Sequence, residues 1–225
     1  MATPPAAYVA LDAVSALTTL IVAGLIFRIW TRLREPIHLL LALGFLLVGL
    51  SFFSVGASQF NLADTVAPWD GLRLAGQLGG AAVIFFAYVG RGARLRYPIM
   101  IPLGWTTAAA TVFIAAAVWI MQASSRGAHY DRLFAPAHAL MMAFYAGVTA
   151  LSARRLLRRP ALENALVPIA FGSWFLTKYT WLIVDLSGSD APIPFVYAWR
   201  LAAIACLMAA VLLPVEPTRG PPHAA

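Results

Sequence analysis

The chain carries its only lysine inside an apolar stretch long enough to cross a lipid bilayer. Lys178 lies near the middle of the segment from Pro160 to Gly188, most of which is apolar or aromatic. A charged side chain at that depth opposes insertion by about 2.5 to 3.5 kcal/mol, so it needs a partner, a water-filled cavity or a function. We therefore expect this helix to enter the membrane as part of a bundle, with Lys178 directed toward protein.

The residues around Lys178 repeat at helical spacing. Steps of four, three and four residues connect Trp174, Lys178, Trp181 and Asp185, and such steps keep side chains on one face of a helix. This face combines a cation, a carboxylate and two indole rings. It is the first candidate for a binding surface.

The rest of the chain has the same character. Of its 225 residues, 61% are hydrophobic and 11% are charged, whereas a soluble domain has about a quarter of its residues charged. The sequence predicts an all-α, polytopic membrane protein with one domain over residues 1–215 and a short cytoplasmic tail over residues 216–225. Seven runs have the length of a transmembrane helix: Tyr8–Trp30, Ile37–Ala57, Leu72–Val89, Ile99–Met121, Phe134–Leu151, Leu166–Leu186 and Phe195–Leu213.

The distribution of charge predicts the orientation. The net charge is +7, and most arginines follow the first, third and fifth runs, whereas the acidic residues gather at the opposite ends. By the positive-inside rule, the N-terminus faces out of the cell membrane and the C-terminus faces in. This explains the positive charge without nucleic acid as a partner, and it predicts a basic inner face that can meet a membrane or cytoplasmic protein. The arginines in question are Arg28, Arg32, Arg34, Arg91, Arg94, Arg96, Arg154, Arg155, Arg158 and Arg159.

The first three runs resemble the last three. Leu72-Arg73-Leu74-Ala75 matches Trp199-Arg200-Leu201-Ala202, and the prolines that follow the first and fifth runs, Pro36 and Pro160, stand at a similar separation. We expect a parallel repeat of residues 8–90 and 134–213, joined by a linker helix over residues 99–121. The alternative is that arginine-terminated apolar helices look alike. A layout of three, one and three helices is similar to that of SWEET-type sugar transporters, whose proline–glutamine type signature this sequence lacks, and in broad outline to that of microbial rhodopsins.

The phrase ALGFLLVGLSFF, which follows the first basic turn, resembles uncharacterised prokaryotic seven-helix membrane proteins and the membrane input regions of sensor kinases. The resemblance covers about the first two runs. It implies a sensor-like role and identifies no functional residue.

Polar residues concentrate in the outer half of the predicted bundle, which indicates a polar pocket that opens outward. Such a pocket suits a small anionic or zwitterionic ligand, with Lys178 and Arg200 as its cationic contacts. The predicted ligand-binding residues are Lys178, Asp185, Arg200, Asp12, His138, Trp174, Trp181 and Gln77, and the tyrosines expected in its walls are Tyr8, Tyr145, Tyr179 and Tyr197.

The sequence favours a sensor-like or ligand-binding bundle, or a subunit of a larger membrane complex, and leaves two other functions open. A small-solute transporter would rock its two repeats around the pocket. A retinal-type protein would attach its chromophore to Lys178, although rhodopsins carry that lysine in the seventh span and not the sixth. We find no catalytic motif and expect no enzyme, no metal site can be assigned, and no cofactor can be named.

The polar residues also have structural interpretations. Lys178 would pair with Asp12 or Asp185 and hold two helices together. Asp12 would cap the first helix, and His138 would be a hydrogen-bonded interior side chain. Cys206 is the sole cysteine, which excludes a disulfide within the chain.

Overall fold

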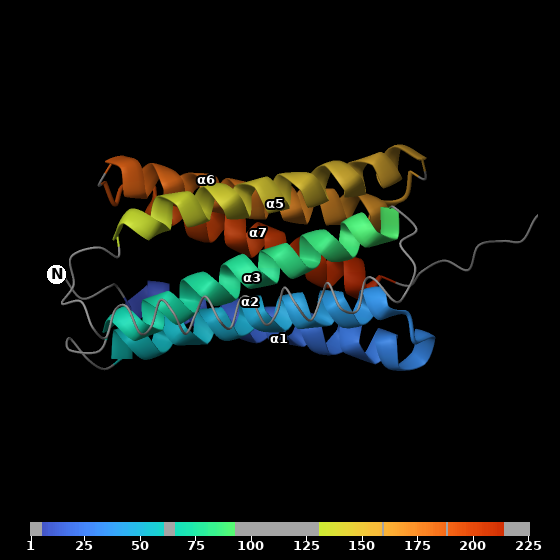
Figure 1. Cartoon of the computed structure of the whole chain (residues 1–225), viewed down its shortest axis with the longest axis horizontal. Helices are drawn as coiled ribbons and strands as arrows, with labels where there is room; N and C mark the ends of the chain where they lie inside the picture. The colour runs from blue at the N-terminus through green and yellow to red at the C-terminus, as the bar shows by residue number, and fades with distance from the viewer. Residues whose placement is uncertain (1–5, 61–65, 93–130, 159, 188, 214–225) are drawn as a thin grey trace, which may run out of the picture.

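The computed structural model describes residues 6–60, 66–92, 131–158, 160–187 and 189–213, and these residues form six α-helices (Figure 1). The fourth predicted span, Ile99–Met121, and the predicted tail lie outside the described residues. Each of the other six spans corresponds to a helix that extends beyond or close to the predicted limits. The helices are α1 (Ala6–Leu33), α2 (Pro36–Phe60), α3 (Val66–Gly92), α5 (Asp131–Arg158), α6 (Leu162–Ser187) and α7 (Ile193–Leu212).

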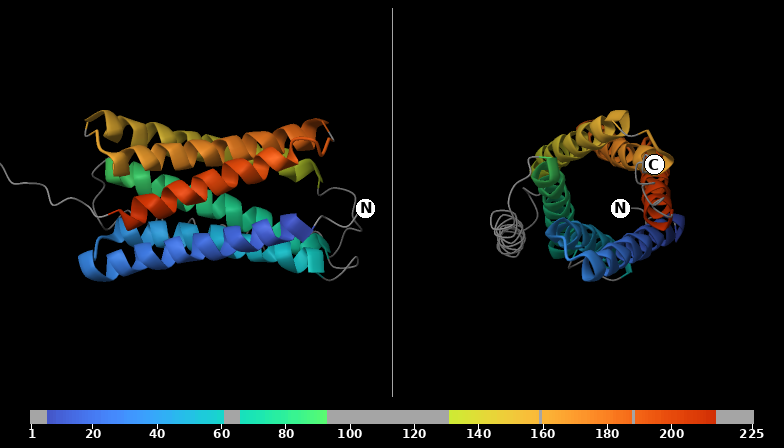
Figure 2. Two further views of the ribbon diagram at one scale, coloured as in Figure 1. Left: turned by 180° about the vertical axis from the view of Figure 1, so that it is seen from behind. Right: turned by 90° about the vertical axis from the view of Figure 1, so that its right-hand side faces the viewer.

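The six helices form a closed ring when seen along their axes (Figure 2). Within the first half, α1–α3, and within the second half, α5–α7, each helix packs against its neighbour in the chain. The ring closes where α3 packs against α5 and where α7 packs against α1. We call these two contacts the α3/α5 seam and the α1/α7 seam. At each seam the two helices run in the same direction (Figure 1).

Length and composition allow four of these helices to cross a membrane: Tyr8–Leu33, Pro36–Phe53, Arg73–Gly90 and Ile193–Leu212. The structure therefore supports a membrane protein with at least these four candidate spans. Helices α5 and α6 have 28 and 26 residues, which is also enough to cross, but they carry more polar and charged residues.

The sharp corner between α1 and α2 follows from the local sequence. Arg34 has a φ of 55°, and its backbone N–H donates to the carbonyl of Trp30 at 2.7 Å, which ends α1 with a left-handed residue. Glu35 precedes Pro36 and is therefore disfavoured in a helical conformation, while Pro36 begins α2, where its missing N–H costs nothing.

Aromatic side chains fill the interior of the ring and join its two halves. Phe45 of α2 lies 6.4 Å from Phe171 and 5.7 Å from Trp174 of α6, measured between ring centroids. Tyr145 of α5 lies 5.3 Å from the same Trp174. Because α2 and α6 do not pack directly on each other, these large rings bridge the space that the backbones enclose.

In the first half, glycines bring α2 and α3 close together. A Cβ atom on Gly80 would lie 2.5 Å from Cγ2 of Val48 and 2.7 Å from the carbonyl oxygen of Gly44. A Cβ atom on Gly76 would lie 2.9 Å from Cβ of Ser51. Small residues are the usual means by which membrane helices approach closely, since lipid provides no hydrophobic drive for association.

Candidate ligand-binding site

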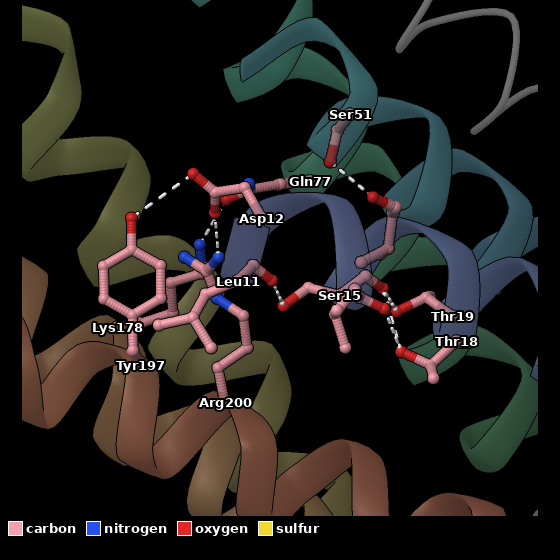
Figure 3. A network of polar contacts seen from close by, with 12 residues as sticks. Leu11, Asp12, Ser15, Thr18, Thr19, Ser51, Gln77, Lys178, Tyr197 and Arg200 are labelled. Carbon is pink, nitrogen blue, oxygen red and sulfur yellow. Dashed lines mark hydrogen bonds and ion pairs between the residues drawn. The ribbon is translucent and has the colours of Figure 1, made fainter. Parts of the chain in front are cut away.

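A buried ion pair connects the two ends of the chain at the α1/α7 seam (Figure 3). The guanidinium of Arg200 donates through Nη1 to Oδ1 of Asp12. The hydroxyl of Tyr197 donates to the other carboxylate oxygen, Oδ2, at 3.3 Å. Both Asp12 and Arg200 are 2% exposed, so the pair is withdrawn from solvent.

The helix positions explain this arrangement. Tyr197 and Arg200 are three residues apart on α7, so they share a face, and that face meets α1 at the seam. The guanidinium carbon of Arg200 also stands 4.6 Å from the ring centroid of Phe52 and 4.9 Å from that of Tyr197. Asp12 lies in the second turn of α1, which begins at Ala6, and therefore does not cap that helix. The capping interpretation is wrong because Asp12 lies inside the helix and not at its first residue.

Lys178 is buried, as its place in an apolar span predicts, with 6% of its surface exposed. Its ammonium Nζ donates a hydrogen bond to Oε1 of Gln77 on α3 (Figure 3). This contact joins α6 of the second half to α3 of the first. The carboxylate of Asp12, one of the two predicted partners of Lys178, accepts hydrogen bonds from Arg200 and Tyr197.

A second group of polar and aromatic side chains surrounds Trp181 where α3, α5 and α6 approach one another. The imidazole of His138 stacks on the indole of Trp181, with centroids 6.2 Å apart and planes 17° apart. The guanidinium carbon of Arg73 lies 5.3 Å from the Trp181 ring centroid. The indole Nε1 of Trp181 is buried without a hydrogen-bond partner.

A small cavity lies beside the ion pair and Lys178. It offers about 10 Å³ to the centre of a water-sized sphere, which is room for about one water molecule. Both halves of the ring line it, through Val48, Phe52, Gln77, Tyr145, Trp174, Thr177, Lys178 and Arg200. The Nε atom of Arg200 is buried without a hydrogen-bond acceptor.

Charged side chains lie around this cavity. Among the buried side chains that the structure describes are the basic groups of Lys178 and Arg200 and the acidic group of Asp12. The neighbouring Thr177 is not a free donor, because its hydroxyl donates to the carbonyl of Ser173 at 2.9 Å. The site therefore presents two basic side chains and, at Nε of Arg200, an N–H donor without an acceptor, which is chemistry that can bind an anion.

The structure brings together five of the eight predicted site residues: Asp12, Gln77, Trp174, Lys178 and Arg200. His138 and Trp181 form the separate stack described above. Asp185 belongs to α6, but its side chain is outside the described residues. Sequence reasoning missed Val48, Phe52 and Thr177 as lining residues; only Thr177, which adjoins Lys178, had a signal that could have found it.

Of the four tyrosines predicted in the walls, Tyr145 lines the cavity, whereas Tyr8, Tyr179 and Tyr197 are not among its lining residues. Tyr179 is 46% exposed, so it faces away from the cavity. Consecutive residues on an α-helix point about 100° apart, and the burial of Lys178 turns its neighbour Tyr179 outward. Tyr145 and Tyr197 are buried as predicted, and Tyr8 stacks on Tyr197 with centroids 4.8 Å apart.

No protein-family model, curated protein or solved structure matches this chain. Within the described ranges, no group of three His, Cys, Asp or Glu side chains is placed to hold a metal ion. The interpretation of the site therefore rests on its own geometry and charge.

Proposed function

We propose that the protein is an integral membrane protein of the ligand-binding, sensor-like type, which holds a small anion between the two halves of its helix ring. The observation that carries this proposal is the cavity lined from both halves, beside which Nε of Arg200 is buried without a hydrogen-bond acceptor. A buried N–H donor without an acceptor is costly. An anion in the cavity would accept a hydrogen bond from this N–H and would lie close to Lys178 and Arg200, which both line the cavity.

The size of the cavity narrows the class of ligand. Space for about one water molecule suits a monatomic or small inorganic anion such as chloride, and it does not favour a sugar or an amino acid. It also does not favour a lysine-linked chromophore, because a polyene needs a long pocket beside Lys178. Of the predicted anionic and zwitterionic ligands, a small anion is therefore the kind that fits this cavity.

We further propose that the halves are a parallel repeat and that α5, α6 and a helix within the undescribed residues complete seven spans. Equivalent residues support a nearly constant offset: Asp12 and His138 are 126 residues apart, and Arg73 and Arg200 are 127 apart. The equal lengths of α1 and α5, 28 residues each, agree with this. An N-terminus outside and C-terminus inside would put the ends of α1 and α5, with their arginines, on the cytoplasmic side, where a partner protein could receive a signal.

Anion binding is tested by thermal unfolding of the protein in detergent at constant ionic strength. We expect sodium chloride to raise the unfolding temperature relative to sodium gluconate, whose anion is too large for the cavity, because a ligand of the folded state stabilises it. Lys178→Met should abolish the chloride effect, whereas Arg154→Gln, which removes an exposed charge on α5, should retain it. If chloride and gluconate act alike on the parent protein, the anion site does not exist.

Transport is the second candidate, because the cavity lies between the halves and transporters bind substrates at such repeat interfaces. Proteoliposomes loaded with a chloride-sensitive dye separate the two functions. Protein-dependent flux that Lys178→Met abolishes would indicate a transporter. Anion-specific stabilisation without flux would indicate a sensor or a complex subunit, and absence of both would reject the two candidates together.

A further inference from the structure

A groove lies at the α1/α7 seam near the ends of both helices. It has a volume of about 190 Å³, and it is separate from the interior cavity. Its lining consists of three apolar side chains and two arginines: Leu25, Ile29, Val211, Arg28 and Arg32. Both arginines are exposed, so the groove is open at their side chains.

The two arginines are placed to hold one anionic group together. Arg28 and Arg32 are four residues apart on α1, so their side chains lie one above the other on the same face. Guanidinium groups bind phosphate oxygens with paired N–H donors, which makes two adjacent arginines a strong phosphate site. Within the described ranges, neither guanidinium forms an ion pair with a carboxylate of the protein.

The surface that continues from the groove along α1 is apolar. Leu25 of the groove is followed toward the middle of the membrane by Ile21 and Leu17, which are exposed and stand at helical spacing from it. Along α7, Leu201 is exposed in the same way. In a helix with the length and composition of a membrane span, such a surface contacts acyl chains. A phosphate site at the end of an acyl-chain surface matches the shape of a phospholipid.

We infer that Arg28 and Arg32 bind the phosphate of an anionic phospholipid in this groove, with its acyl chains along α1 and α7. Basic pockets between membrane helices bind such head groups, and each basic residue contributes appreciably to the affinity. This inference depends on the protein lying in a membrane but not on the anion site in the ring.

The chain supplies a charge-matched control at the other seam. Arg154 and Arg158 lie 126 residues after Arg28 and Arg32, and they too are exposed and four residues apart near the end of their helix, α5. Helices α1 and α5 end at the same end of the ring (Figure 1). The double variants R28Q/R32Q and R154Q/R158Q therefore remove the same charge from the same end of the molecule.

The test is native mass spectrometry of the full chain released from micelles that contain dioleoyl phosphatidylglycerol or dioleoyl phosphatidylcholine. We expect a phosphatidylglycerol adduct on the parent protein, an affinity about tenfold or more lower in R28Q/R32Q, and little change in R154Q/R158Q. Circular dichroism of each variant checks that the helices are intact. An equal loss in both double variants would mean diffuse attraction to the basic end, and equal binding of the two lipids would mean that charge is not recognised. Either result would overturn the inference.

Two other occupants of the groove would also be detected. If inorganic phosphate displaces the lipid at millimolar concentration and binds as well alone, the groove is a free-anion site and not a lipid site. If R28Q/R32Q converts a dimer to a monomer while the lipid adduct persists, the groove is an interface with a second copy. Persistence of the lipid adduct at parental affinity in R28Q/R32Q rejects the assignment directly.

Discussion

The two seams of the ring each hold an arginine, but they surround it with different groups. At the α1/α7 seam, Arg200 binds the carboxylate of Asp12. On the α3 side of the other seam, Arg73 lies over the indole of Trp181, on which His138 stacks. In the proposed repeat, Asp12 and His138 occupy equivalent positions, as do Arg200 and Arg73. One seam is therefore ionic and the other aromatic.

Under the proposed repeat, this difference makes one of two equivalent sites ionic and the other aromatic. Removing either partner of a buried ion pair is strongly destabilising, because the other charge stays buried without its counter-charge. A cation above an aromatic ring is weaker and tolerates replacement more easily. We therefore expect substitutions at the α1/α7 seam, next to the cavity, to lower the free energy of unfolding more than substitutions at the α3/α5 seam.

The largest effect should come from breaking the ion pair. Asp12→Ala leaves Arg200 buried without its carboxylate and should lower the free energy of unfolding by about 3 to 5 kcal/mol, measured by denaturant titration in detergent. His138→Ala, at the equivalent position of the other seam, should cost less than half as much. The double variant Asp12→Ala/Arg200→Met should recover most of the loss. Equal losses for Asp12→Ala and His138→Ala would contradict the asymmetry.

The contact between the halves should rank next. Gln77→Leu removes the acceptor of a buried, charge-assisted hydrogen bond from Lys178 and should cost about 1.5 to 3 kcal/mol of unfolding free energy. Adding Lys178→Met to Gln77→Leu should restore part of the stability, since both polar groups are then replaced by apolar ones. A double-mutant cycle measures the coupling. Additive losses would show that the two side chains do not interact.

Packing within the halves also differs, and glycine substitutions measure it. Gly80→Ala places a methyl group 2.5 Å from Val48 in the first half and should cost about 1 to 3 kcal/mol through overpacking. Gly172→Ala in the second half finds its nearest neighbour, Cγ2 of Thr149, at 3.9 Å and should be tolerated or slightly stabilising. Thermal unfolding of the two variants side by side makes the comparison. A loss at Gly172 as large as that at Gly80 would mean that the halves are packed equally tightly.

The smallest effect should be found at Arg73. Arg73→Leu removes the cation above Trp181 and should cost about 0.5 to 1 kcal/mol, whereas Arg73→Lys should retain most of the interaction. Denaturant titration against the parent protein has the precision to separate the two variants if the midpoints are compared at fixed slope. If Arg73→Leu destabilises the protein as much as Asp12→Ala does, the α3/α5 seam does not tolerate substitution better than the α1/α7 seam.

Much of the architecture follows from the sequence, because it depends on local properties. Apolar runs of membrane length give helices wherever the chain is described, and Glu35-Pro36 determines where α1 ends and α2 begins. Burial of Lys178 also follows, since a lone ammonium at that depth is expected to face protein. Short connections predict that consecutive helices pack together, which they do within each half.

The partners of the buried charges were decided only by the tertiary structure. A helix can present a given residue to either neighbour, and its rotation depends on all the helices packed around it. The sequence offered Asp12 and Asp185 as partners of Lys178 and did not predict that Gln77 accepts its hydrogen bond. The closure of the ring at its two seams brought Asp12 and Arg200, 188 residues apart in the chain, into contact. It also turned Tyr179 outward. Hydropathy and spacing determine that these buried polar side chains need partners. The order in which the helices close into a ring determines which groups become those partners.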